Sequence, residues 1–147
     1  MKIQSINITK FKNLKKLVLD VSKHNGLSLI IGNNASGKSN FLEALSEIFY
    51  NQFQNESSKL KYEIQYIDFA NKAITISHKS ISTELPKRIV AVYSGEEDRL
   101  WKTYYEKLYK QYIDDILKNK AIEFPKMLYL NKYYWDISLL CLLDKAF

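Results

Sequence analysis

The first third of the chain alternates between hydrophobic and polar residues, which is the pattern of half-buried β-strands. Isoleucines among polar residues predict a strand over residues 2–8, and residues 17–21 form a second strand-like run. The basic stretch between them, residues 9–16, predicts a turn and therefore an antiparallel strand pair. Residues 27–31, LSLII, form a continuous apolar run that predicts a buried strand.

A helical period replaces the alternation in residues 40–49, where apolar residues recur three and four positions apart. The residues of this stripe are Phe41, Ala44, Leu45, Ile48 and Phe49. Residues 51–58 are polar and predict a loop. Residues 61–69 and 73–78 then predict two strands of a hairpin, with a bulge or an edge position for the first of them.

The second half of the chain begins with a β-branched run over residues 85–93, which predicts a central strand. Residues 101–117 carry a broad aromatic and aliphatic stripe at helical spacing, which predicts a helix packed against a sheet or a neighbouring helix. Residues 127–130 form another apolar run, and residues 132–147 predict a last, largely apolar helix that expects a neighbour.

The octapeptide GNNASGKS stands between the apolar run at residues 27–31 and the helix at residues 40–49. It matches G-x-x-x-x-G-K-[ST], and the order strand, glycine loop, helix is the context that this phosphate-binding loop requires. The candidate nucleotide-binding residues of this segment are Gly32, Asn33, Asn34, Ala35, Ser36, Gly37, Lys38, Ser39 and Asn40.

Each of these residue types has a chemical role in binding a nucleotide. Gly32 and Gly37 permit backbone angles and a close approach that a side chain would block. Backbone N–H groups and the helix N-terminus favour an anion, so we expect phosphates there. Lys38 is expected to reach the β- and γ-phosphates of ATP, and the Ser39 hydroxyl to bind Mg²⁺. A guanine-specific N-K-x-D motif is missing, but the sequence does not decide between ATP and GTP.

The opening MKIQSINITKFKNLKKLVLDV, followed by GLSLIIGNNASGKSNFLEAL, resembles the N-terminal half of an ABC-type ATPase head. The most similar group is the SMC/RecF-like and OLD-like class, whose bacterial members are often labelled AAA ATPases. In that class a phenylalanine and a basic residue follow the first strand; here they are Phe11 and Lys12. The resemblance implies that Lys12, with Asn13, lies near the nucleotide. A solvated lysine in a turn is the equal alternative for Lys12.

The resemblance implies an α/β P-loop NTPase fold with a mixed sheet, an antiparallel β-subdomain and C-terminal helices. We expect one partial domain over residues 1–147, made of a P-loop unit (1–50), a β-hairpin region (51–84) and a core strand with aromatic helices (85–147). Such heads also need a signature motif and a Walker B strand that ends in Asp-Glu. Neither is recognisable, and we expect this chain to be the N-terminal lobe alone.

Residues 94–100, SGEEDRL, superficially resemble the ABC signature but lack its second glycine. We favour a helix-capping turn, in which Ser94 and Gly95 cap and the acidic residues face the helix N-terminus. Ser94 and Glu96 remain weak candidates for the site, because the loop after a core strand of such heads often faces the nucleotide. No catalytic carboxylate can be assigned from the sequence.

The composition of the chain excludes few classes of protein. The 147 residues are 46% hydrophobic and 26% charged, as in an ordinary globular domain. A single cysteine, Cys141, rules out an internal disulfide and fits a reducing cytoplasm. No apolar run approaches the roughly 18 residues of a membrane helix. The net charge of +6 tolerates an anionic partner, but only two of the 22 basic residues, Arg88 and Arg99, are arginines.

Two classes of function follow. The first is the ATP-binding lobe of an ABC-type ATPase in DNA maintenance or phage defence. Its hydrolysis would require the missing C-terminal lobe and a second head. The late stretch FPKMLYLNKYYWDISLLCLL resembles restriction-associated members of the class. The second class is a non-catalytic interaction module with a vestigial P-loop. A homo-oligomer or a partner protein is expected in either case, and a complete small kinase is disfavoured because no second catalytic motif is recognisable.

Overall fold

The computed structural model describes residues 1–24, 27–93, 98–120 and 124–131. The chain forms two compact units, Met1–Pro86 and Lys87–Phe147. None of the described helices is long and apolar enough to cross a membrane.

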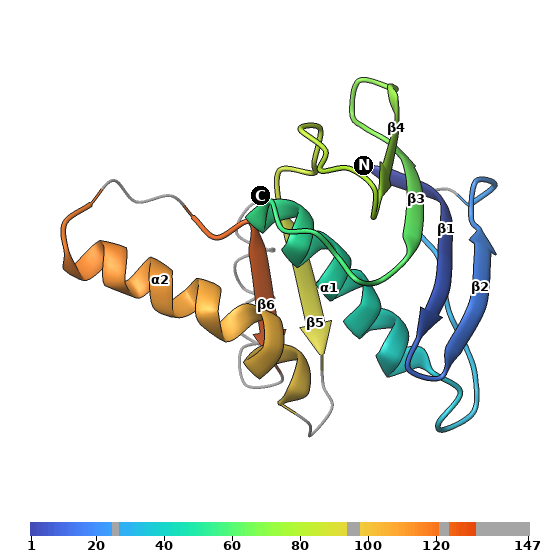
Figure 1. Ribbon diagram of the computed structural model, residues 1–147, viewed down its shortest axis with the longest axis horizontal. Coiled ribbons are helices and arrows are strands. Elements are labelled where there is room, and N and C mark those ends of the chain that lie inside the picture. The colour runs from blue at the N-terminus through green and yellow to red at the C-terminus, as the bar shows by residue number, and fades with distance from the viewer. Residues whose placement is uncertain (25–26, 94–97, 121–123, 132–147) are drawn as a thin grey trace, which may run out of the picture. The chain divides into compact units, whose positions relative to one another are not determined.

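The first unit is built on a four-stranded antiparallel sheet (Figure 1). Its strands are β1 (Lys2–Phe11), β2 (Leu14–Asp20), β3 (Tyr62–Ile67) and β4 (Ala73–Ser77), arranged in the order β2-β1-β3-β4. Two predictions are confirmed here, because β1 pairs with β2 and β3 pairs with β4. A register shift that was expected in β3 lies instead in its partner β1, between Ile3 and Ser5, and β3 is an inner strand of the sheet.

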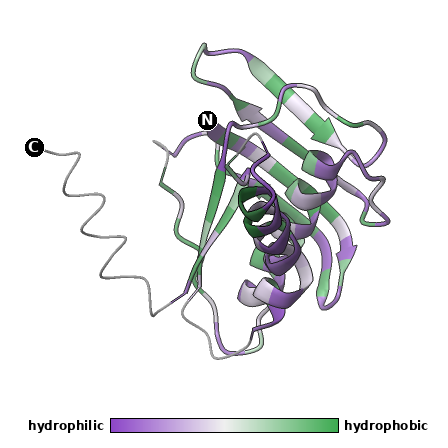
Figure 2. Cartoon of the chain, turned by 90° about the vertical axis from the view of Figure 1, so that its left-hand side faces the viewer, coloured by the Kyte–Doolittle hydropathy of each residue, from purple (hydrophilic) through white to green (hydrophobic). Residues whose placement is uncertain are grey.

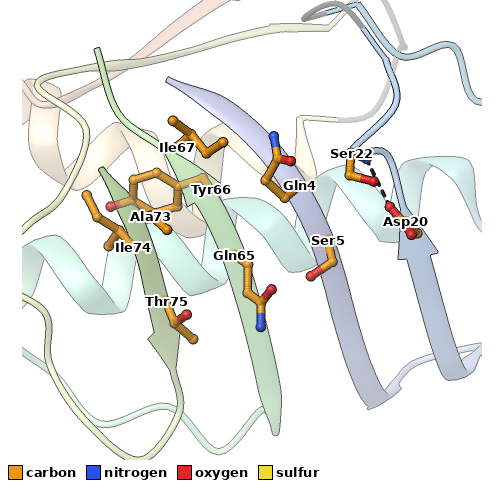
Figure 3. A pocket seen from close by; sticks show the side chains of 10 residues that line it. All are labelled: Gln4, Ser5, Asp20, Ser22, Gln65, Tyr66, Ile67, Ala73, Ile74 and Thr75. Atoms are coloured by element: carbon orange, nitrogen blue, oxygen red, sulfur yellow. Dashed lines mark hydrogen bonds between the residues drawn. The ribbon is translucent and has the colours of Figure 1, made fainter. Parts of the chain in front are cut away.

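The two faces of this sheet differ in polarity, as period-two alternation requires. Hydrophobic and hydrophilic residues alternate along the strands (Figure 2). Ile6 and Ile8 of β1 and Ile64 of β3 are almost fully buried, with at most 4% of each exposed. On the other face Ser5, Gln65 and other polar residues point away from α1, which runs behind the sheet in Figure 3.

Helix α1 (Lys38–Gln54) covers the apolar face of the sheet and confirms the predicted helix. Its buried residues are Phe41, Glu43, Ala44, Ser46, Ile48, Phe49 and Gln52. The prediction that a loop begins at residue 51 was wrong, because the helix continues to Gln54 and Asn55 ends it in a left-handed conformation. The polar Gln52 is buried there and donates from Nε2 to the Tyr62 hydroxyl at 2.7 Å.

Residues 27–31 do not form the predicted buried strand. Leu27, Leu29 and Ile31 are 85%, 80% and 83% exposed. A strand needs a hydrogen-bonding neighbour, and among the described residues no strand pairs with this segment. Its apolar residues predicted the burial that a sheet would give, but the pattern holds no information on whether a sheet edge is available.

The second unit contains a two-stranded parallel sheet of β5 (Ile89–Tyr93) and β6 (Met127–Asn131), in which Ala91 lies opposite Tyr129. The strand at β5 was predicted, whereas residues 127–130 had been noted only as an apolar run. The expectation of a central strand at residues 85–93 is not met within the described part of the chain, where β5 pairs with β6 alone.

The predicted helix at residues 101–117 is present, but its first turn, Trp101–Tyr105, is a π-helix, and α2 (Glu106–Leu117) follows it. Trp101 and Tyr105 pack against Tyr129 of β6, with ring centroids 5.8 Å and 5.1 Å away. The predicted burial fails further along, where Leu117 is 75% exposed and no residue of α2 is buried. The aromatic stripe is therefore a core element only at its N-terminal end.

Candidate functional site

The phosphate-loop motif joins residues 27–31 to helix α1. Residues 32–36 are exposed, Gly37 is buried, and Lys38, Ser39 and Asn40 form the first turn of α1. Gly37 has φ of +104° and Ala35 has φ of +62°. Both angles lie in the left-handed region, which glycine tolerates and alanine adopts only under constraint. The sequence therefore folds into a sharply turned loop directly before a 17-residue helix.

Both glycines of the motif stand where a side chain would collide. A Cβ on Gly37 would lie 2.8 Å from Leu14 Cδ2 and 3.0 Å from Asn13 Oδ1. A Cβ on Gly32 would lie 2.6 Å from Ser36 Oγ. The motif thus uses glycine for space at both positions, and additionally for backbone angle at Gly37.

Lys38 turns back over the loop that precedes it. Its Nζ donates to the carbonyl oxygens of Gly32 at 2.5 Å and Asn33 at 2.7 Å. The ammonium group is therefore held beside the loop backbone. Lys38 is also the residue that contacts the phosphates in this motif.

The N-terminus of α1 has the electrostatics of an anion site. No side chain caps the helix at Gly37, and the first turn contains no acidic residue. The helix dipole and the first backbone N–H groups favour negative charge at this end. Ser39 lies in the same turn, so its hydroxyl could bind Mg²⁺ beside a bound phosphate. Among the described residues, no three His, Cys, Asp or Glu side chains gather as a metal site of their own.

The turn between β1 and β2, which contains Lys12 and Asn13, contacts the loop through Asn13 and helix α1 through Lys12. The Asn13 side chain donates from Nδ2 to the Ala35 carbonyl at 3.0 Å and accepts from Asn40 Nδ2 at 2.7 Å. Lys12 Nζ forms an ion pair with Glu43 of α1, whose side chain is only 5% exposed. The structure therefore brings the two turn residues and the P-loop together.

Glu43 was missed as a member of the site by the sequence reasoning. An available signal was its position within the predicted helix, between the apolar residues Phe41 and Ala44. An acidic residue on a buried stripe needs a cation or hydrogen bonds, since burying an unpaired charge is costly.

Two of the hollows lined by described residues of the first unit bear on the site. One, of about 340 Å³, is mainly apolar and is lined by Lys38 together with Phe41, Ile30 and other apolar residues. The other, of about 420 Å³, lies on the polar face of the sheet and is lined by Ser5, Gln65 and Asp20 among others (Figure 3). Hydrogen bonds from Ser22 hold the pKa of Asp20 below its ordinary value. Only the first hollow adjoins the P-loop lysine.

The remaining candidates do not join this site. Ser94 and Glu96, with the capping turn expected there, lie outside the described residues, as do Cys141 and the helix expected at residues 132–147.

Comparison with known families matches residues 1–138 to the family model described as AAA ATPase domain. The match covers the whole first unit, including the phosphate-loop segment, and the second unit up to residue 138. Neither the curated proteins nor the solved structures gave a match.

Proposed function

The chain belongs to the AAA ATPase domain family, and from this premise we propose that residues 32–39 bind the triphosphate of ATP together with Mg²⁺. Membership of the family indicates a nucleotide-binding ATPase. The finer assignment, residue by residue, is the proposal.

The observation that carries the proposal is the loop-to-helix geometry at Gly37 and Lys38. A left-handed glycine turns the chain into a helix whose N-terminus has neither a side-chain cap nor an acidic residue in its first turn. Lys38 places its ammonium group against the carbonyls of the same loop. Phosphate oxygens can take the place of those carbonyls, because they carry full negative charge and form stronger hydrogen bonds to an ammonium.

Lys12 supplies a second positive charge to this neighbourhood. Its ammonium group has three donors, and the pair with Glu43 leaves 39% of the Lys12 side chain exposed. We propose that Lys12 keeps its bond to Glu43 and turns another N–H toward the nucleotide. Ser39 is the proposed protein ligand of Mg²⁺, with phosphate oxygens and water completing the shell.

For the wider role, we propose an ABC-type head of the SMC/RecF-like class that acts in DNA maintenance or phage defence. The resemblance of residues 1–50 to that class supports this proposal. In such heads hydrolysis takes place between two subunits, so a further lobe and a second head, or a partner protein, are part of the proposal. A cytoplasmic location is proposed with it.

The competing function is a non-catalytic interaction module in which the P-loop is a relic. Exposed apolar residues on α2, such as Leu117, favour a contact surface in that unit. This alternative predicts that the loop has no measurable affinity for nucleotide.

The deciding experiment is calorimetric titration of the purified chain with Mg·ATP, beside Lys38→Ala and the control Lys61→Ala. Lys61 is exposed, directly precedes β3 and is not a residue of the motif. We expect binding by the wild type and the control, and an affinity loss of roughly tenfold or more in Lys38→Ala, because a charged hydrogen-bond donor is removed. A folded wild type that binds no nucleotide would reject the proposal and favour the interaction module.

A further inference from the structure

Asn13 bridges the phosphate loop and helix α1 through both ends of its amide. Nδ2 donates to the Ala35 carbonyl at 3.0 Å, and Oδ1 accepts from Asn40 Nδ2 at 2.7 Å. Asn13 itself belongs to the turn between β1 and β2, which is 22 residues away from Ala35 in the sequence. The loop is therefore tied to a part of the sheet that precedes it in the chain.

The bond to Ala35 falls on the part of the loop that most needs outside support. Ala35 has φ of +62°, a conformation that a residue with a Cβ adopts at a cost in energy. Such conformations persist where surrounding contacts determine them. The peptide between Ala35 and Ser36 is held at both ends, since Asn13 binds its carbonyl and its N–H donates to the Asn33 carbonyl at 3.2 Å.

Packing adds a second constraint from the same turn. Gly37 is buried, and a Cβ there would lie 3.0 Å from Asn13 Oδ1 and 2.8 Å from Leu14 Cδ2. Asn13 and Leu14 thus occupy the space beside the left-handed glycine. A shift of this turn would remove both the hydrogen bond at Ala35 and the wall beside Gly37.

We infer that Asn13 is a positioning residue that holds the phosphate loop in its anion-binding form, and not a ligand of the nucleotide. Its carbonyl oxygen and an N–H of its amide are already used by Asn40 and Ala35. The inference rests on the proposed function, because it assigns to Asn13 the shape of the loop that binds phosphate. It gives a structural role to a residue that the family resemblance places only near the nucleotide.

The test compares Asn13→Ala with Gln65→Ala, which removes an exposed amide from the polar face of the same sheet. Calorimetry measures the affinities for Mg·ATP and for inorganic tripolyphosphate. We expect Asn13→Ala to weaken both by the same factor, roughly three- to tenfold, since one or two hydrogen bonds supporting the loop are lost. Gln65→Ala should leave both affinities unchanged.

A second readout needs no nucleotide. Amide hydrogen exchange of residues 33–38 should accelerate in unliganded Asn13→Ala and stay unchanged in Gln65→Ala, because the loop loses its support even when empty. If Asn13→Ala does not fold, Asn13→Asp serves instead. It keeps an acceptor for Asn40 and removes the donor to Ala35, so the same acceleration is expected.

Three results would overturn the inference. Weaker binding of ATP with unchanged binding of tripolyphosphate would mean that Asn13 contacts the base or the ribose. Unchanged exchange in the empty loop would mean that Asn13 does not position it, and unchanged affinities would leave it without a role in binding. If the wild type binds neither anion, the proposed function fails, whereas the exchange experiment still decides whether Asn13 holds the loop.

Discussion

Lys12, in the turn between β1 and β2, forms an ion pair with Glu43 in the second turn of α1. The carboxylate side chain is 5% exposed and the lysine side chain 39%. The pair joins the sheet to the helix that carries the phosphate-loop lysine. The same turn therefore contacts the loop through Asn13 and the helix through Lys12.

Removing the charge of Lys12 should destabilise the first unit. Lys12→Met keeps most of the side-chain stem but leaves the buried Glu43 carboxylate without this ammonium group. We expect the free energy of unfolding to fall by about 1–2 kcal/mol, less than for a fully buried pair because Lys12 is partly solvated. Urea denaturation measures this, and Lys10→Met, at an exposed position near the end of β1, should change it by less than about 0.5 kcal/mol.

The double variant Lys12→Met with Glu43→Gln provides the check. If the pair is the cause, the second substitution removes the carboxylate charge that has lost Lys12, and the double variant should be more stable than the sum of the single losses predicts. Strictly additive losses would contradict the assignment.

Gly37→Ala should be more harmful than Gly32→Ala. At Gly37 the new Cβ meets the Leu14 Cδ2 methyl at 2.8 Å, and the backbone φ of +104° strains any residue with a Cβ even where the leucine moves aside. We expect about 1–3 kcal/mol of destabilisation and weaker binding of Mg·ATP. Thermal unfolding and calorimetry measure the two effects.

Gly32→Ala is the milder partner of that comparison, because its Cβ meets the rotatable Ser36 Oγ. Adding Ser36→Ala should restore part of the loss. Equal damage from both glycine substitutions would mean that the left-handed angle of Gly37 is not what limits the loop.

Gln52 should stabilise the end of α1 against the segment that follows β4. Nε2 donates to the Tyr62 hydroxyl at 2.7 Å and to the Ser80 carbonyl at 3.0 Å, and Oε1 accepts from the Ser82 N–H at 2.9 Å. Gln52→Ala should cost about 2–3 kcal/mol in urea denaturation, since several part-buried groups lose their partner together. Gln54→Ala, exposed on the next part of the same helix, should cost less than about 0.5 kcal/mol; a similar cost for both would refute this role.

Stability should also fall at alkaline pH. Burial raises the pKa of the Tyr62 hydroxyl above its ordinary value of 10.0, and the hydrogen bond from Gln52 opposes this only in part. The unfolded chain then releases the hydroxyl proton at a lower pH than the folded chain. The contribution of protonated Tyr62 to the free energy of unfolding is therefore intact below pH 10 and is lost as pH rises through the folded pKa. Circular dichroism between about pH 9 and 12 follows the loss, and Tyr62→Phe should make the decline shallower. An identical decline in that variant would exclude Tyr62 as a source.

The four strands of the first unit and the position of the loop could be predicted from the sequence, because alternation and helical spacing are local signals, but the pairing of β1 with β3 could not. The strand pair β1–β2, the hairpin β3–β4 and helix α1 all follow from them. The end of α1 could not be predicted. Gln52 is a polar residue, and it is buried only because Tyr62 and a distant segment offer it hydrogen bonds.

Two features depend on partners that a local pattern does not contain. Residues 27–31 have the composition of a buried strand, yet Leu29 is 80% exposed because no described strand pairs with the segment. Glu43 became part of the site only when folding brought Lys12 to it from 31 residues away. The motif itself located the P-loop, but its supporting contacts had to come from the three-dimensional structure.

The pairing of β1 with β3 also has a consequence for biosynthesis. Lys2 lies opposite Ile67 and Ile8 opposite Tyr62. In the sequence, the loop and α1 therefore lie between two strands that pair with each other. A nascent chain can form the β1–β2 hairpin early, but it cannot complete this sheet until β3 has left the ribosome. At about 5–20 residues per second, the wait after β2 is on the order of a few seconds. During that interval the apolar stripe of α1 lacks the cover that β3 later completes.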